Sequence, residues 1–148
     1  MNTHRYLRAY MAGIVVPTVV LAIIITAFFI ARYVSNVQIP IERAIIFPMA
    51  LVPSLFGLWN MLYTRLHTHR YLSLGLHGAL LPLILMPLGA TGAVALGFLS
   101  IADRGVIWFQ AITIPYALLA PWFGVALVAY YLVWKHLIGF FNRVLEIA

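Results

Sequence analysis

Four long apolar stretches occupy almost the whole chain and limit what it can fold into. They run at roughly residues 7–34, 44–66, 72–101 and 108–138. A helix that crosses the hydrocarbon core of a bilayer needs about 20 mostly apolar residues, and every stretch meets that length. Hydrophobic residues make up 65% of the 148 residues and charged residues only 8%, so too few polar side chains exist to cover a soluble core. We therefore expect an all-α integral membrane protein with four transmembrane helices.

The chain also contains an internal repeat. Thr-His-Arg-Tyr-Leu at residues 3–7 recurs unchanged at residues 68–72. Gly13 and Pro17 follow the first copy at the distances at which Gly78 and Pro82 follow the second. A later block of identities, which pairs Phe56, Gly57 and Tyr63 with Phe123, Gly124 and Tyr130, has an offset larger by two residues. Such an offset change is typical of a small length difference in a connection. The pattern indicates a tandem duplication.

The repeat predicts the architecture of the single transmembrane domain, residues 1–148. Repeat 1 covers about residues 3–67, repeat 2 about residues 68–138, and residues 139–148 form a short C-terminal tail. A unit with two spans returns to its starting side, so both units should have the same topology, related by an axis along the membrane normal. The first and third helices should then be equivalent, as should the second and fourth.

Basic residues predict the orientation, because Lys and Arg near helix ends are retained on the cytoplasmic side. Six of the nine fall on one side of the predicted bundle, namely Arg5, Arg8, Arg65, Arg70, Lys135 and Arg143. Both termini of this multi-pass protein should therefore be cytoplasmic. The net charge of +6 is not carried by a basic soluble module, so nucleic acid is not an expected partner. The expected partner is the anionic lipid headgroups at the cytoplasmic face of the membrane.

Polar residues that differ between the repeats are the candidates for a ligand-binding site. Asn60 corresponds to Leu127 and His77 to Ala12. Asn60 and His77 are equally distant from the turn between the second and third helices, so they should lie at one depth, roughly 13 Å from that turn. The hypothesised ligand-binding residues are Asn60, His77, Tyr63, Tyr130 and Tyr10, with Arg65 and Arg70 at the mouth of the site. The alternative is a single Asn-His hydrogen bond that fixes the register of the helices.

The sequence excludes several kinds of chemistry. The central parts of the spans contain no Asp or Glu, which disfavours proton-driven or sodium-driven transport. The chain has no cysteine and no phosphate-binding loop, zinc-protease motif or serine elbow. His67, His69 and His136 lie on the cytoplasmic side without carboxylate or thiolate support, so no metal site is expected. We assign no catalytic residue, and the sequence implies no cofactor.

Prolines and small residues affect how the predicted helices pack. Every span contains proline, which kinks a helix either for packing or around a small cavity. Gly89, Ala93 and Gly97 recur every four residues and predict a smooth strip on which another helix packs closely. The partner helix could come from the same chain or from another copy in a homo-oligomer.

The sequence is compatible with three functions. The first is an oligomeric transport or channel-type protein for an uncharged or anionic solute, without carboxylate-based proton coupling. The second is a non-catalytic accessory or assembly subunit of a larger membrane complex. The third is a membrane enzyme that acts on a lipophilic substrate, for which the sequence offers no catalytic motif.

Overall fold

The computed structural model describes residues 3–36, 49–67, 72–108 and 112–147. Within these ranges the chain is mostly helical. The helices are α1 (Thr3–Tyr33), α3 (Ala50–Leu66), α4 (Leu74–Ala95), α5 (Tyr116–Leu132), the π-helix η3 (Val133–Ile138) and α6 (Gly139–Val144). Three helical segments are long and apolar enough to cross a membrane: His4–Tyr33, Leu74–Ala95 and Tyr116–Val144. The described residues therefore support a helical membrane protein with three candidate spans.

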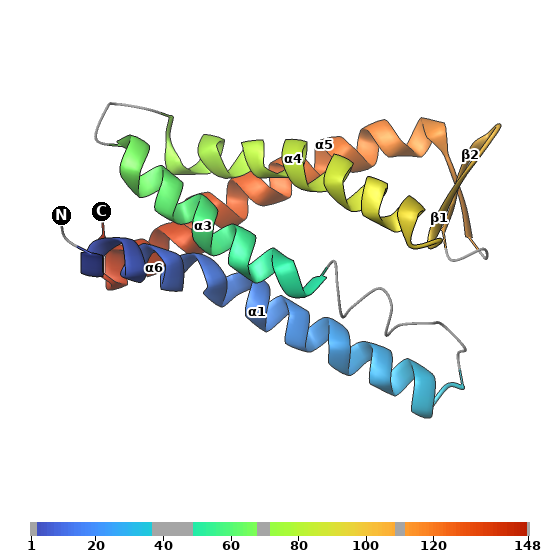
Figure 1. Cartoon of the computed structure of the whole chain (residues 1–148), viewed down its shortest axis with the longest axis horizontal. Coiled ribbons are helices and arrows are strands. Elements are labelled where there is room, and N and C mark those ends of the chain that lie inside the picture. Colours follow the sequence, from blue (N-terminus) through green and yellow to red (C-terminus); the bar gives the residue numbers. More distant parts are fainter. Residues whose placement is uncertain (1–2, 37–48, 68–71, 109–111, 148) are drawn as a thin grey trace.

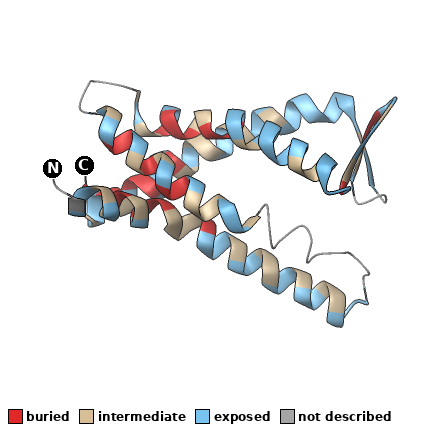
Figure 2. Ribbon diagram, viewed as in Figure 1, coloured by how far each residue is buried: buried red, intermediate tan, exposed pale blue. Residues whose placement is uncertain are grey.

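The helices converge at one end of the molecule and diverge at the other (Figure 1). α1 packs mainly along α3, and α4 packs along α5 and η3. The two termini, the end of α3 and the start of α4 share the convergent end, whereas α1 and α5 are far apart at the opposite end. Most buried residues gather at the convergent end (Figure 2). The core there includes Phe56, Leu81, Trp134 and Ile138.

Glycines set how closely the helices approach at the convergent end. A Cβ atom at Gly13 would lie 2.6 Å from the carbonyl oxygen of Phe56 and 2.8 Å from the Cα of Gly57. On α4, Gly75 lies against the ring of Tyr131, and Gly78 lies against the ring of Trp134. Any larger side chain would have to displace these neighbours, so both helix pairs depend on glycine for their spacing.

The two helix pairs do not use equivalent glycines. Gly13 in repeat 1 meets Gly57, but the counterpart of Gly57, Gly124, would have nothing within 4 Å of an added Cβ atom. Gly78, the counterpart of Gly13, instead packs on Trp134. Glycines at equivalent positions of the two repeats therefore make different packing contacts. The repeat symmetry and the fourth span remain predictions.

The chain between α4 and α5 forms a small antiparallel sheet, which corrects the expected helix bounds. Its strands β1 (Leu99–Ala102), β2 (Gly105–Trp108) and β3 (Ile112–Pro115) lie in the order β1-β2-β3. The hydropathy pattern predicted helix at residues 96–101 and 108–115, of which residues 109–111 lie outside the described residues. Strands instead cover residues 99–101, 108 and 112–115. This segment is rich in β-branched residues, which favour extended backbone, and Asp103 and Arg104 form a two-residue turn.

Gly97 ends α4 ahead of this sheet. Its φ angle is +76°, a left-handed conformation that glycine adopts readily. The amide of Phe98 donates to the carbonyl of Ala93 at 2.8 Å, and that of Gly97 donates to the carbonyl of Val94 at 3.0 Å. These two bonds form a Schellman motif, a common C-terminal cap of helices. Gly97 therefore terminates the helix and does not extend the small-residue strip that we expected.

The N-terminal and C-terminal segments are tied to each other. Arg5 donates to the carbonyl of Ile147 at 3.2 Å, and Arg8 donates to the carbonyl of Leu145 at 3.1 Å. The side chain of Ile147 is buried in a cluster with Ala9 and Ala12 of α1. Two arginines that the sequence analysis assigned to the cytoplasmic face thus also bind carbonyl groups at the end of the chain.

Candidate functional site

Asn60 of α3 is completely buried and bridges three helices. Its Nδ2 donates to the carbonyl of Ala9 on α1 at 2.8 Å and to Oδ1 of Asn142 on α6 at 2.7 Å. Nδ2 of Asn142 donates back to Oδ1 of Asn60 at 3.1 Å. Both amide hydrogens of Asn60 are therefore used inside the protein. This arrangement satisfies buried polar groups and fixes the relative positions of α1, α3 and α6.

His77 of α4 forms a second reciprocal contact, with Trp59 of α3. Nε2 of His77 lies 3.1 Å from the carbonyl oxygen of Trp59, and the indole Nε1 of Trp59 donates to the carbonyl of His77 at 2.9 Å. A carbonyl oxygen only accepts, so Nε2 of His77 carries a hydrogen in this arrangement. The two bonds hold the start of α4 in register with α3.

Aromatic rings surround the imidazole of His77. The ring of Trp59 stacks on it at a centroid distance of 4.8 Å, while the rings of Tyr63 and Trp134 lie at 5.2 Å and 6.0 Å. Nδ1 of His77 and Nε1 of Trp134 are buried and have no hydrogen-bond partner among the described residues. Trp134 belongs to η3, and π-helical segments often occur at functional sites.

The structure thus brings some of the predicted site residues together and separates others. Tyr63 lies beside His77, whereas Asn60 is bonded to Asn142 and Ala9 and not to His77 in the described residues. Tyr10 donates to the hydroxyl of Ser54 at 3.3 Å. The side chain of Arg65 is exposed, and Arg70 lies outside the described residues. The alternative interpretation, a single Asn-His hydrogen bond, is not found among the described residues, where Asn60 and His77 each bond to other partners.

Sequence reasoning missed Asn142 and the two tryptophans. Asn142 lies in the tail, beyond the two repeats, so the comparison of repeats could not reveal it. A signal was nevertheless present, because Asn142 is a lone amide in the apolar C-terminal region. Trp59 and Trp134 resemble ordinary core or interface residues in the sequence, and only the fold shows that they contact His77.

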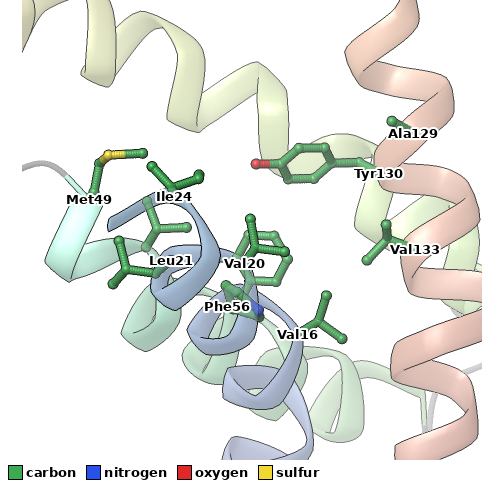
Figure 3. Close-up of a pocket in the computed structure, with 11 residues that line it drawn as sticks. Val16, Val20, Leu21, Ile24, Met49, Phe56, Ala129, Tyr130 and Val133 are labelled. Atoms are coloured by element: carbon green, nitrogen blue, oxygen red, sulfur yellow. The ribbon is translucent and has the colours of Figure 1, made fainter. Parts of the chain in front are cut away.

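A separate apolar pocket of about 220 Å³ opens between α1, α3 and α5 (Figure 3). Val16, Val20, Leu21 and Ile24 line it from α1. Tyr130 lines it from α5, and Figure 3 shows its hydroxyl directed toward α1 across the opening. None of its 11 lining residues is charged. Of the site residues predicted from the sequence, Tyr130 is the one that reaches this pocket.

A larger pocket of about 730 Å³ lies beside the sheet at the divergent end. Gly89 and Ala93 of α4 line it, together with residues of α5 and of the strands. An added Cβ atom at Gly89 or Gly92 would meet nothing within 4 Å. The small-residue face of α4 is thus open toward this pocket and does not pack against a helix among the described residues.

The histidines near the convergent end do not form a metal site in the described residues, where no group of three His, Cys, Asp or Glu side chains gathers. The ring of His67 lies 5.2 Å from that of Tyr63, and the side chain of His136 is exposed. His69 lies outside the described residues.

No protein-family model, curated protein or solved structure matches the chain.

Proposed function

We propose that this chain is a transport-type integral membrane protein that binds an uncharged, lipophilic molecule in the pocket between α1, α3 and α5. The observation that carries the proposal is the lining of this pocket, which is almost wholly apolar and in which Tyr130 is the one residue whose side chain carries a hydroxyl. Ligand sites are typically apolar cavities with a few polar groups that fix the orientation of the ligand. A long-chain alcohol, ketone or ester has that chemistry.

The lining of the pocket favours an uncharged ligand over an anionic one. Transfer of an unpaired ionised group to apolar surroundings is strongly unfavourable, and no lining residue could neutralise it. The hydroxyl of Tyr130 can donate one hydrogen bond and accept another. In this proposal Tyr130 contacts the polar group of the ligand, whereas Asn60, His77, Tyr63 and Tyr10 hold the helices in place.

We further propose that α3 is the fourth span and that both termini face the cytoplasm. Arg5 and Arg8 lie near the N-terminus, and Arg65 lies at the end of α3 that shares the same side of the molecule. Such basic residues are retained on the cytoplasmic side and attract anionic headgroups. The sheet would then be on the external side.

Ligand binding can be tested with two neighbouring isoleucines of α1. Ile24 lines the pocket, whereas Ile23 does not and is 63% exposed. In lipid nanodiscs, Ile24→Trp should weaken binding of a fluorescent long-chain alcohol several-fold because the indole fills the pocket. Ile23→Trp should leave the affinity unchanged. Equal affinities for all three proteins would contradict the proposal, as would tighter binding of the matching carboxylate at neutral pH.

A second candidate function, an assembly subunit, is supported by a contrast between glycines. Gly13, Gly57, Gly75 and Gly78 are covered by neighbouring residues, but Gly89, Gly92 and Gly124 would leave an added Cβ atom without a neighbour within 4 Å. Small residues at a helix surface permit close approach of another transmembrane helix. The partner would be a second copy of the chain or a larger membrane protein.

This candidate is tested by the mass of the protein after extraction in mild detergent. If the open glycines hold a partner, Gly92→Leu and Gly124→Leu should each reduce the mass of the complex. Ala22→Leu, at an exposed position of α1, a helix that carries none of the open glycines, is the matched control. A monomer of 16.6 kDa in the unsubstituted protein would rule the candidate out.

A further inference from the structure

The three-stranded sheet has one wholly apolar face. Residues that are paired across antiparallel strands share a face, and so do residues two apart along a strand. The register pairs Leu99 with Trp108 and Ile112, and pairs Ile101 with Val106 and Ile114. These six large apolar residues therefore lie on the same side. Ser100, Ala102, Gly105, Ile107, Thr113 and Pro115 lie on the other, which is mostly small or polar.

The apolar face is directed toward the helices. Leu99, Val106, Trp108 and Ile114 line the 730 Å³ pocket beside α4 and α5, and no residue of the opposite face does so. The two remaining residues of the apolar face are exposed, Ile101 at 73% and Ile112 at 62%. The face thus extends beyond the pocket, with large apolar side chains that no described residue covers.

The length of α4 places this sheet at a membrane boundary. Its 22 residues span about 33 Å at 1.5 Å per residue, close to the roughly 30 Å of a hydrocarbon core. β1 begins four residues after α4 ends. The sheet cannot lie in the hydrocarbon itself, because the outer edges of β1 and β3 have no strand partner among the described residues and unpaired backbone groups are excluded from lipid.

We propose that the sheet lies flat in the headgroup layer of the bilayer, with its apolar face on the acyl chains. Ile101 and Ile112 enter the upper part of the hydrocarbon, and Trp108 lies at the depth where indole rings accumulate. Chains of neighbouring lipids fill the pocket beneath the sheet. The polar face, with Ser100 and Thr113, faces water. This inference requires that α4 spans the membrane, and it does not depend on a ligand near Tyr130.

The absence of native cysteine permits a direct test by site-specific labelling. Ile101→Cys and Ile112→Cys report on the apolar face, and Ser100→Cys and Thr113→Cys are controls on the opposite face. All four positions are exposed, so the substitutions should not disturb folding, which circular dichroism can verify. Each variant is labelled with the fluorophore NBD and reconstituted in phosphatidylcholine vesicles, with or without lipid that is spin-labelled at carbon 5.

We expect blue-shifted emission and several-fold stronger quenching by the spin-labelled lipid at positions 101 and 112 than at positions 100 and 113. Equal, water-like emission at all four positions would show that the sheet stands clear of the bilayer. Blue-shifted emission at positions 101 and 112 without lipid quenching would show that another protein chain covers the apolar face. Strong quenching on both faces would show that the sheet lies inside the hydrocarbon. Each of these three results would overturn the proposal.

Discussion

Asn60 and Asn142 are 82 residues apart in the sequence, yet their buried side-chain amides exchange hydrogen bonds of 2.7 Å and 3.1 Å. A bond that joins α3 to α6 ties the C-terminal segment to the middle of the chain. Because lipid offers no alternative partner, each amide depends on the other.

This pairing predicts energetic coupling between the two residues. Asn142→Leu should destabilise the protein by about 1–3 kcal/mol because it leaves a buried amide partly unsatisfied. The double substitution Asn60→Leu with Asn142→Leu should cost less than the sum of the two single substitutions. Unfolding by sodium dodecyl sulfate in mixed micelles, followed by circular dichroism, gives these free energies. Strictly additive effects would mean that the amides do not interact.

Alanine substitutions at two glycines of α4 should change the stability of the protein in opposite directions. Gly78→Ala forces a methyl group into the ring of Trp134 and should cost about 1–3 kcal/mol, as overpacking usually does. Gly92→Ala meets nothing within 4 Å and should stabilise the monomer by up to about 1 kcal/mol, the difference in helix propensity. The same unfolding assay compares them. Similar changes in stability would contradict the packing of α4 on η3.

A cap at Glu146 ends α6, in which the amide of Ile147 donates to the carbonyl of Asn142 at 2.9 Å and that of Glu146 donates to the carbonyl of Arg143 at 3.1 Å. Glu146 has a φ angle of +52°, and a left-handed conformation costs an L-residue roughly 1–2 kcal/mol. Its ion pair with Arg8, at 3.9 Å, is largely exposed and contributes little. Glu146→Gly should therefore give a more stable protein than Glu146→Ala by about 1 kcal/mol. Since both variants lack the carboxylate, equal stability would argue against this cap geometry.

Replacement of His77 separates a structural role from ligand binding. His77→Ala removes the bond to the Trp59 carbonyl and leaves a cavity among aromatic rings, so the unfolding free energy should fall by about 2–4 kcal/mol. Because His77 does not line the pocket beside Tyr130, the affinity for a long-chain alcohol should not change at a temperature where the variant is folded. Loss of affinity in a folded variant would instead assign His77 to the binding site.

The sequence predicted the helical membrane character but not where the helices end. Residues 72–101 are apolar throughout, and hydropathy alone cannot separate a helix from the strand that follows it. A glycine at position 97 and the β-branched residues that follow it, such as Ile101 and Val106, were local signals of the change. They were hidden by the regular spacing of Gly89, Ala93 and Gly97, which resembles a helix-packing strip.

The candidate site was predictable only in part, for a related reason. Comparison of the repeats singled out Asn60 and His77, and both are buried polar residues at the convergent end. Their partners could not be derived, because Asn142 lies outside the repeats and Trp59 uses backbone as well as side-chain atoms. Nor could the sequence show that Tyr130 enters an apolar pocket, since this depends on how α1 and α5 diverge.

Photolabelling tests most directly whether a lipophilic molecule binds in the pocket between α1, α3 and α5, because it shows where such a molecule reacts with the protein. A long-chain alcohol that carries a diazirine is bound in nanodiscs and photoactivated, and the labelled peptides are mapped by mass spectrometry. Labelling should concentrate on Leu21, Ile24 and Tyr130, which line the pocket, and excess unlabelled alcohol should suppress it. Labelling that is spread evenly over outward-facing residues such as Val19 and Ile23, and that excess alcohol does not reduce, would contradict the claim.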